Sequence, residues 1–121
     1  MKAPIAVRHG QGIFLPELDL WLDPRQSRAR AFVSHAHSDH FARHDWTLCS
    51  AATRSLIEAR YGGAASDTVA TSAWDEPFQE GGHVLRLLPA GHILGSAMLH
   101  VIRLADGASL LYTGDFEIIR K

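Results

Sequence analysis

The feature that most constrains this chain is a dense group of metal-binding side chains directly after a short apolar run. The run Arg30–Val33 predicts a β-strand, and the residues that follow it, Ser34 to His40, read SHAHSDH. Imidazole rings need a hydrogen bond or a ligand when they are buried, so this density favours a metal site over separate structural uses. The fold therefore has to leave the end of this strand at an edge that other ligands can reach.

The spacing of the group suggests two neighbouring cations. His35 and His37 are two residues apart, so in an extended loop both rings point the same way and can bind one cation. Asp39 and His40 diverge from that pair and can bind a second cation beside the first. Imidazole nitrogens with a carboxylate oxygen suit zinc or manganese, and the absence of thiolate ligands favours a catalytic site over a closed structural one.

Two more candidate ligands follow predicted strands later in the chain. His92 comes shortly after the strand 83–88, and Gly91 before it allows a close approach of the backbone. Asp115 follows the strand 109–113 and could bridge two cations through its two oxygens. The hypothesis is a two-metal site in which Asp39 and Asp115 are catalytic, since paired cations can activate water and neutralise charge on a phosphate or carbonyl oxygen. It assigns one metal to His35, His37 and His92, the other to Asp39 and His40, and the bridge to Asp115.

The remaining pattern predicts many short strands and one helix. We expect further strands at 5–9, 13–15, 20–22, 47–50 and 97–104. A helix is expected over Ala51–Tyr61, begun by Ser50 and ended by Gly62-Gly63, and 64–77 is expected to be a loop. Asp106-Gly107 predicts a hairpin between the strands 97–104 and 109–113. The expected fold class is α/β, mostly the β-rich layer of an α/β sandwich.

Composition sets broad limits. The 121 residues amount to about one domain, and the net charge of −1 neither requires nor excludes nucleic acid. Cys49 is the only cysteine, so no internal disulfide can form, which suits a reducing cytoplasm. No apolar run is long enough to span a membrane, and we expect a cytoplasmic protein without a membrane partner.

These motifs resemble the metallo-β-lactamase superfamily, whose signature is His-x-His-x-Asp-His. The second motif is matched by His35, His37, Asp39 and His40, the third by His92 and the fourth by Asp115. Asp23, in Leu22-Asp23-Pro24, is similar to the first-motif aspartate, which in the family orients the metal ligands without binding the metal itself. The resemblance implies an αββα sandwich with two divalent metal ions, zinc or manganese. Residues 1–121 would be its N-terminal, β-rich part.

The flanking residues resemble the nucleic-acid-processing branch of that superfamily. LLPAGHILGSAM, Leu87 to Met98, and LLYTGDF, Leu110 to Phe116, are similar to messenger-RNA 3′-end processing factors and to bacterial ligase-associated DNA exonucleases. This likeness implies hydrolysis of phosphodiesters at DNA or RNA ends, with nucleic acid as a partner and association with a DNA ligase. The family's fifth-motif histidine and inserted second domain have no counterpart here, so we expect a fragment of a longer enzyme.

Other readings stay open at this point. The same scaffold could hydrolyse a small ester, thioester or lactone, or the truncated chain could be an inactive remnant. His44, four residues after His40, is expected to have a supporting or surface role. Trp21, Trp46 and Trp74 are expected to anchor the core or loops rather than to stack on bases.

Overall fold

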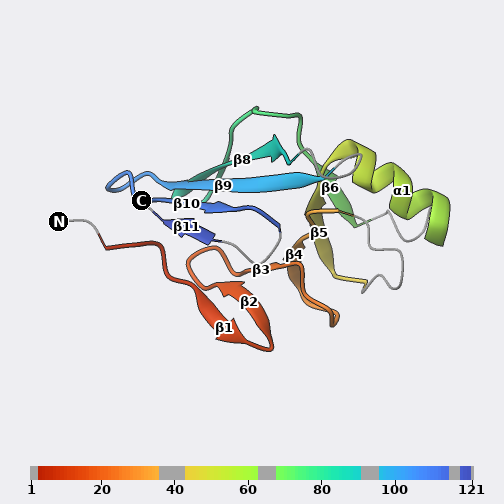
Figure 1. Cartoon of the computed structure of the whole chain (residues 1–121), viewed down its shortest axis with the longest axis horizontal. Coiled ribbons are helices and arrows are strands. Elements are labelled where there is room, and N and C mark those ends of the chain that lie inside the picture. Colours follow the sequence, from red (N-terminus) through yellow and green to blue (C-terminus); the bar gives the residue numbers. More distant parts are fainter. Residues whose placement is uncertain (1–2, 36–42, 63–67, 91–95, 115–117, 121) are drawn as a thin grey trace.

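The structure is a computed structural model that describes residues 3–35, 43–62, 68–90, 96–114 and 118–120. Within these residues the chain forms two β-sheets and one α-helix (Figure 1). The first sheet has the order β1-β2-β3-β4-β5-β6 and the second the order β11-β10-β9-β8-β7. The strands of the first sheet are β1 (Arg8–Gly10), β2 (Gly12–Leu15), β3 (Leu20–Leu22), β4 (Arg30–Phe32), β5 (Trp46–Cys49) and β6 (Val69–Thr71). Those of the second are β7 (Phe78–Glu80), β8 (His83–Pro89), β9 (Ala97–Arg103), β10 (Ser109–Tyr112) and β11 (Ile118–Arg120).

The two sheets share one hydrophobic core. Leu22, Phe32 and Leu48 of the first sheet belong to the same buried cluster as Leu87 and Leu99 of the second. Each of these side chains is at most 2% exposed, and burying one contributes about 1.5–3 kcal/mol before entropy is counted. This core explains the alternation of buried and half-buried residues along β8 and β9, because successive side chains of a strand point to opposite faces.

The first sheet changes from antiparallel to parallel pairing as it is crossed. β1, β2 and β3 pair antiparallel, whereas β3, β4, β5 and β6 pair parallel. Parallel neighbours need crossover connections, and α1 (Ala51–Tyr61) provides the one between β5 and β6. The second sheet is antiparallel throughout its described pairs.

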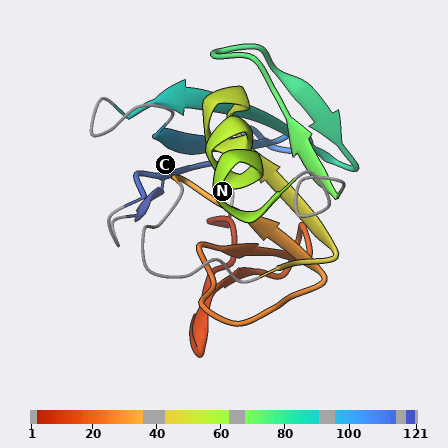
Figure 2. The same ribbon diagram turned by 90° about the vertical axis from the view of Figure 1, so that its right-hand side faces the viewer.

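The predicted helix is confirmed at both ends. The Ser50 side chain accepts a hydrogen bond from the Thr53 backbone at 3.1 Å, which satisfies one of the unpaired donors of the first turn. Gly62 follows the last turn with φ of 90°, a conformation that favours glycine. Ile57 is fully buried, and α1 lies against β6 at one end of the molecule (Figures 1 and 2).

A second, small apolar cluster lies on the other face of the first sheet. It consists of Val33, Cys49 and Val69. Val33 and Cys49 directly follow Phe32 and Leu48 of the main core, so their side chains point to the opposite face. The parallel half of the first sheet is therefore apolar on both faces, as buried parallel strands usually are.

The strand predictions are partly confirmed. A hairpin joins β1 to β2, and the hairpin expected at Asp106-Gly107 joins β9 to β10, where Gly107 has φ of 76°. The first strand begins at Arg8 rather than at position 5, and Ile5 packs in the core outside any strand. The expected loop 64–77 was wrong over β6, because Val69–Thr71 pairs with β5 through a long-range parallel contact that no local turn signal announces.

The predicted fold class is confirmed. Two sheets share one core and a helix lies beside one of them, as expected for the β-rich layer of an α/β sandwich. Over the described residues, no helix is both long and apolar enough to cross a membrane.

Candidate metal centre

The strands that precede the predicted ligands end close together. β8 and β9 pair with Pro89 opposite Ala97, and β9 and β10 pair with Leu99 opposite Tyr112. The end of β8, the start of β9 and the end of β10 therefore lie along one edge of the second sheet. The backbone N–H of Ala97 donates a hydrogen bond to the carbonyl oxygen of Ser34 at 2.8 Å, which joins this edge to the segment after β4.

Asp23 lies at the centre of this junction. Its carboxylate accepts hydrogen bonds from the Ser34 backbone N–H at 2.8 Å and from the Tyr112 hydroxyl at 2.7 Å, one on each oxygen. Its own N–H donates to the Phe32 carbonyl at 2.8 Å. Asp23 has a φ of 46°, a left-handed conformation that aspartate tolerates better than most residues. One side chain thus connects β3, the segment after β4 and β10.

Ser34 links Asp23 to His35 through hydrogen bonds. The Ser34 hydroxyl lies 2.9 Å from Nδ1 of His35, within hydrogen-bonding distance. Ser34 is fully buried, and its N–H and carbonyl are both bonded, to Asp23 and Ala97 respectively. The backbone that carries His35 is therefore held on both sides before any ligand binds.

Gly114 allows β10 to end close to Ser34. A Cβ atom added at this glycine would lie 3.2 Å from both Cβ and Oγ of Ser34, tighter than ordinary van der Waals contact. The φ of Gly114 is 93°, which also favours glycine. The glycine before Asp115 is thus explained by a close approach to the strand end that leads into His35.

Most of the predicted metal ligands lie outside the described residues. These are His37, Asp39, His40, His92 and Asp115. Of the predicted site residues, Asp23 and His35 are described, and they lie on either side of Ser34 in one hydrogen-bonded chain. Among the residues that the structure describes, no group of three or more His, Cys, Asp or Glu side chains is arranged to hold a metal ion. The ligand set remains a prediction.

His44 is buried rather than on the surface, so the expected surface role is wrong. Only 3% of it is exposed, and its Nδ1 accepts a hydrogen bond from the Arg28 backbone at 3.0 Å. Burial lowers the pKa of His44, and the neighbouring positive charge of Arg28 lowers it further, against an opposing effect of Asp45. The neutral ring with Nδ1 as acceptor carries its proton on Nε2.

The one cysteine does not take part in thiolate chemistry. Cys49 is fully buried in the second apolar cluster. Burial raises the pKa of its thiol to about 12, and the positive charge of Arg54 offsets this only in part. A protonated thiol is a poor metal ligand, which agrees with a ligand set of nitrogen and oxygen atoms.

Sequence reasoning missed two residues of the junction, Ser34 and Tyr112. Both lie inside the motifs singled out, Ser34 directly before His35 and Tyr112 three positions before Asp115. The available signal was positional: a hydroxyl beside a predicted ligand is a candidate for its support. Their connection through Asp23 could not be read from the sequence, because Tyr112 and Asp23 are 89 positions apart.

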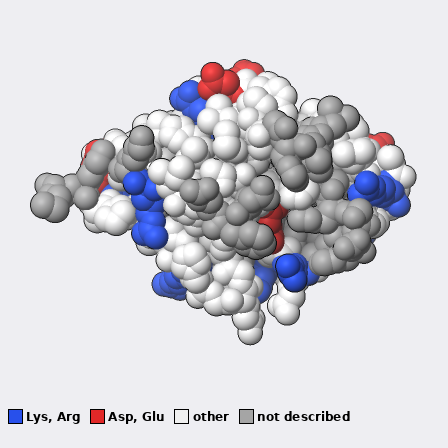
Figure 3. All heavy atoms as spheres, viewed as in Figure 1, with Lys and Arg blue, Asp and Glu red and all other residues white. Residues whose placement is uncertain are grey.

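The described basic residues contact aromatic rings and carboxylates and do not line one continuous basic surface. The guanidinium of Arg28 lies 3.7 Å from the centre of the Trp21 ring, and that of Arg30 lies 4.4 Å from the centre of the Trp46 ring. Figure 3 shows Lys and Arg in several separate groups on the face drawn, so the described part of that face has no continuous basic groove. Trp21 and Trp46 are anchored as expected.

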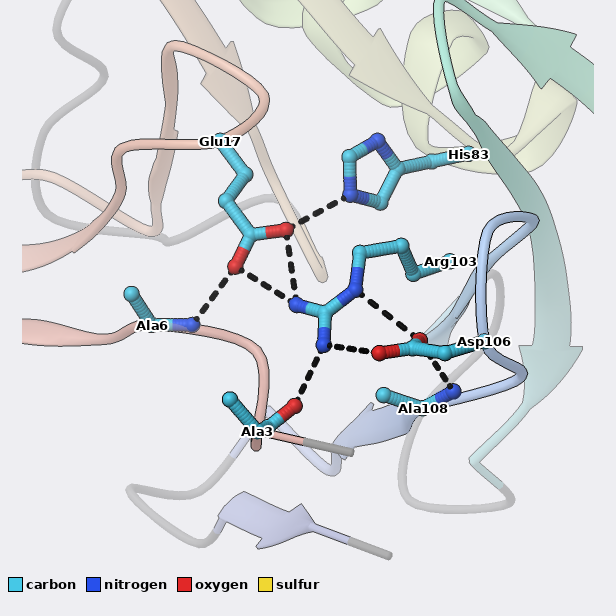
Figure 4. A network of polar contacts seen from close by, with 7 residues as sticks. All are labelled: Ala3, Ala6, Glu17, His83, Arg103, Asp106 and Ala108. Atoms are coloured by element: carbon cyan, nitrogen blue, oxygen red, sulfur yellow. Dashed lines mark hydrogen bonds and ion pairs between the residues drawn. The ribbon is translucent and has the colours of Figure 1, made fainter. Parts of the chain in front are cut away.

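A second polar network lies away from the junction, around Glu17 and Arg103 (Figure 4). Arg103 donates to both oxygens of Glu17, at 3.1 and 3.0 Å, and to both oxygens of Asp106, at 3.0 and 2.8 Å. It also donates to the Ala3 carbonyl, and His83 Nε2 lies 3.0 Å from Glu17. This network attaches the N-terminal segment to the second sheet.

Comparison with known proteins gives three findings. No family model matches the chain. A curated protein of Opitutus terrae named "Probable DNA ligase" is 44% identical over 117 residues, which is 97% of this chain and 11% of that protein. The chain thus spans about a ninth of the length of this relative.

Solved structures with a similar fold include a metallo-β-lactamase of Cronobacter sakazakii described by its HARLDQ motif, and a mutant of it. They are 22% and 21% identical to this chain, each with a TM-score of 0.48, and each covers 74% of it. The chain spans 42% and 41% of their respective lengths. These likenesses concern the fold and carry no information about activity.

Proposed function

We propose that this chain is the N-terminal part of a metal-dependent phosphodiester hydrolase that trims the ends of DNA or RNA. The observation that carries the proposal is the ordered set of His and Asp residues, together with the meeting of the strand ends that precede them. Asp23, directly after β3, joins the segment after β4 to the last residue of β10, and the start of β9 is bonded to Ser34. Ligands placed just beyond such ends can reach a common site.

The donor set fits a pair of divalent ions of the zinc type. Imidazole nitrogens and carboxylate oxygens are suitable ligands, and a histidine that binds zinc nearly always has a hydrogen-bond partner at its other nitrogen. The contact between His35 Nδ1 and the Ser34 hydroxyl has this form. In the proposal, His35, His37 and His92 would hold one ion, Asp39 and His40 would hold the other, and Asp115 would contribute a carboxylate to the pair.

When bound, the ions would supply Lewis acidity and an activated water. The residues of the chain contribute position and charge. Asp39 would bind metal and orient the attacking water, and Asp115 would add a carboxylate to the set that holds the ions. Asp23 keeps the loop that carries His35 in place through the Ser34 backbone.

The choice of nucleic acid rests on two supports. The residues 87–98 and 110–116 resemble those of nucleic-acid-processing enzymes. The relative named "Probable DNA ligase" contains a region similar to almost all of this chain. Ligation needs ends of defined chemistry, so a hydrolase that trims ends would be useful beside a ligase. A reducing cytoplasm suits a chain whose single thiol, Cys49, is buried.

The test is cleavage, in the presence of zinc or manganese, by a purified full-length protein that contains this region. End-labelled single- and double-stranded DNA, the matching RNA and a chromogenic thioester are offered separately. We expect metal-dependent shortening of nucleic acid, reduced at least about 100-fold by Asp39→Asn. His9→Gln is the matched control, because His9 is exposed in β1.

Other outcomes would contradict the proposal in distinct ways. Hydrolysis of the thioester without shortening of nucleic acid would identify a small-molecule hydrolase. Elemental analysis of the purified chain 1–121 that finds no bound metal would identify this chain as an inactive remnant. Undiminished cleavage by Asp39→Asn would refute the assigned ligand set.

A further inference from the structure

We propose that Ser34 and Tyr112 are positioning residues that make Nε2 of His35 the metal-binding nitrogen. The inference rests on the proposed function, since it concerns a ligand of the same metal site. It goes further by naming two residues outside the ligand set and the atom on which they act. The chain of contacts is Tyr112 hydroxyl, Asp23 carboxylate, Ser34 backbone and hydroxyl, and His35 ring.

The first step of the argument concerns which nitrogen of the His35 ring is available to a metal. A histidine binds metal through one nitrogen and donates a hydrogen bond from the other, which fixes the tautomer and the orientation of the ring. The Ser34 hydroxyl lies 2.9 Å from Nδ1. In the state that we propose, Nδ1–H donates to this oxygen, and the electron pair that can bind a metal is on Nε2. Binding through Nδ1 would require this contact to be broken.

The burial of Ser34 carries the second step. Ser34 is fully buried, so water does not readily replace its hydroxyl as a partner of the ring. Its N–H donates to Asp23 and its carbonyl accepts from Ala97, both at 2.8 Å, so its backbone cannot turn freely. The close approach of Gly114 leaves little space on its side-chain face. The hydroxyl is therefore held in one place relative to the ring.

The third step of the argument concerns Tyr112, because Tyr112 holds Asp23 in place and Asp23 in turn holds Ser34. Its hydroxyl donates to the second oxygen of Asp23 at 2.7 Å, and Tyr112 is only 2% exposed. Its ring packs edge-on against Phe32, with centroids 6.1 Å apart and an interplanar angle of 82°. Without the hydroxyl, Asp23 could rotate about its side-chain bonds while still bonded to Ser34.

The experiment measures zinc affinity by competition with a chromogenic chelator, with bound metal confirmed by elemental analysis. We expect Ser34→Ala to weaken zinc binding about 10- to 100-fold, the usual effect of removing such a partner. Tyr112→Phe, which keeps every carbon of the ring, is expected to weaken it by at least about threefold. Ser55→Ala and Tyr61→Phe are the matched controls, because both residues are exposed on α1, and they are expected to leave the affinity unchanged.

A spectroscopic measurement separates positioning from general loss of structure. Long-range proton–nitrogen NMR of the zinc-loaded wild-type protein should show His35 with a protonated Nδ1 and a zinc-shifted Nε2. Zinc on Nδ1 would overturn the inference, as would unchanged affinity in both variants. If Ser34→Ala does not fold, judged by circular dichroism, Tyr112→Phe decides alone, and an unchanged affinity overturns the inference.

The failure of this inference can be told from failure of the proposed function. Zinc bound with the expected tautomer but no cleavage of nucleic acid would overturn the function and leave the role of Ser34 standing. Cleavage together with zinc on Nδ1 would do the reverse. A wild-type chain that binds no zinc would overturn both, because the ligand set itself would be wrong.

Discussion

The molecule has two polar networks that join distant segments, and they are built in opposite ways. At the Asp23 junction, one carboxylate accepts hydrogen bonds from neutral donors, the Ser34 N–H and the Tyr112 hydroxyl, and both donor residues are buried. Around Glu17, charged groups predominate (Figure 4), and the side chains of Arg103, Glu17 and Asp106 are 16%, 25% and 32% exposed. The first network connects three strands beside the candidate metal centre, and the second attaches the N-terminal segment.

The comparison indicates that the number of charges in a network is a poor guide to how much the network stabilises the fold. Exposed ion pairs contribute about 0–1 kcal/mol, because water and salt screen them and long side chains lose entropy when fixed. A buried donor that loses its acceptor costs about 1–3 kcal/mol, because water cannot replace the acceptor. We therefore expect the junction with fewer charges to contribute more to stability.

The largest effect is expected from Asp23→Ala, measured by urea unfolding of the metal-free protein. The change leaves two buried donors unsatisfied, and we expect the free energy of unfolding to fall by about 4 kcal/mol. Asp75→Ala is the matched control, since Asp75 also has a left-handed φ, of 56°, but pairs with Arg86 with 67% of its side chain exposed. Equal losses in the two variants would show that backbone conformation, and not the junction, sets the cost.

Gly114→Ala tests how closely the end of β10 approaches Ser34. The added Cβ meets Ser34 at 3.2 Å and the φ of 93° disfavours alanine, so we expect a loss of about 2–3 kcal/mol by the same measurement. Gly107→Ala shares a left-handed φ, of 76°, but its Cβ would enter open space. Its loss should be about 1 kcal/mol. Similar losses at the two glycines would contradict the close approach.

Tyr112→Phe removes one hydroxyl from the junction and leaves the ring in place. Asp23 then loses one of its two described donors, and we expect the free energy of unfolding to fall by about 1–2 kcal/mol. Thermal or urea unfolding of Ser55→Ala, at an exposed position of α1, should match the wild type. A Tyr112→Phe variant as stable as the wild type would mean that the hydroxyl bond adds no net stability.

The smallest effect is expected from Glu17→Gln in the surface network. Partial burial by itself would raise the pKa of Glu17, but hydrogen bonds from Ala6, His83 and Arg103 outweigh burial and lower the pKa below its ordinary value of 4.5. A lowered folded-state pKa stabilises the fold above the unfolded value, and the gain is lost as the pH falls through the folded value. We expect a loss below about 1 kcal/mol at pH 7 that shrinks on acidification below 4.5. A loss as large as that of Asp23→Ala would reverse the ranking of the two networks.

Local patterns predicted much of the fold, and long-range pairing was the limit. The helix Ala51–Tyr61 and the hairpin at Asp106-Gly107 follow from capping and turn chemistry, which act over a few residues. β6 was missed because its only strong cue is parallel pairing with β5 across a crossover. Parallel strands lack the tight turns that identify hairpins.

For the candidate site, too, neighbouring residues could be predicted from the sequence, whereas contacts between distant residues could not. The cluster from His35 to His40 was visible because its members are adjacent, and Asp23 was singled out by family resemblance. That Asp23 holds Ser34 and Tyr112 together depends on how two sheets meet, which no spacing in the sequence records. The ligand assignments, that of His35 included, stay predictions, and the other five residues lie outside the described ones.

The contact between Tyr112 and Asp23 has a consequence for the order of folding. The two residues are 89 positions apart, so their bond forms only after both sheets have associated. Contacts over such separations slow folding, because a long loop must close, at a cost in entropy, before the contacts can stabilise the chain. Zinc uptake that depends on this bond would therefore require the two sheets to be associated first.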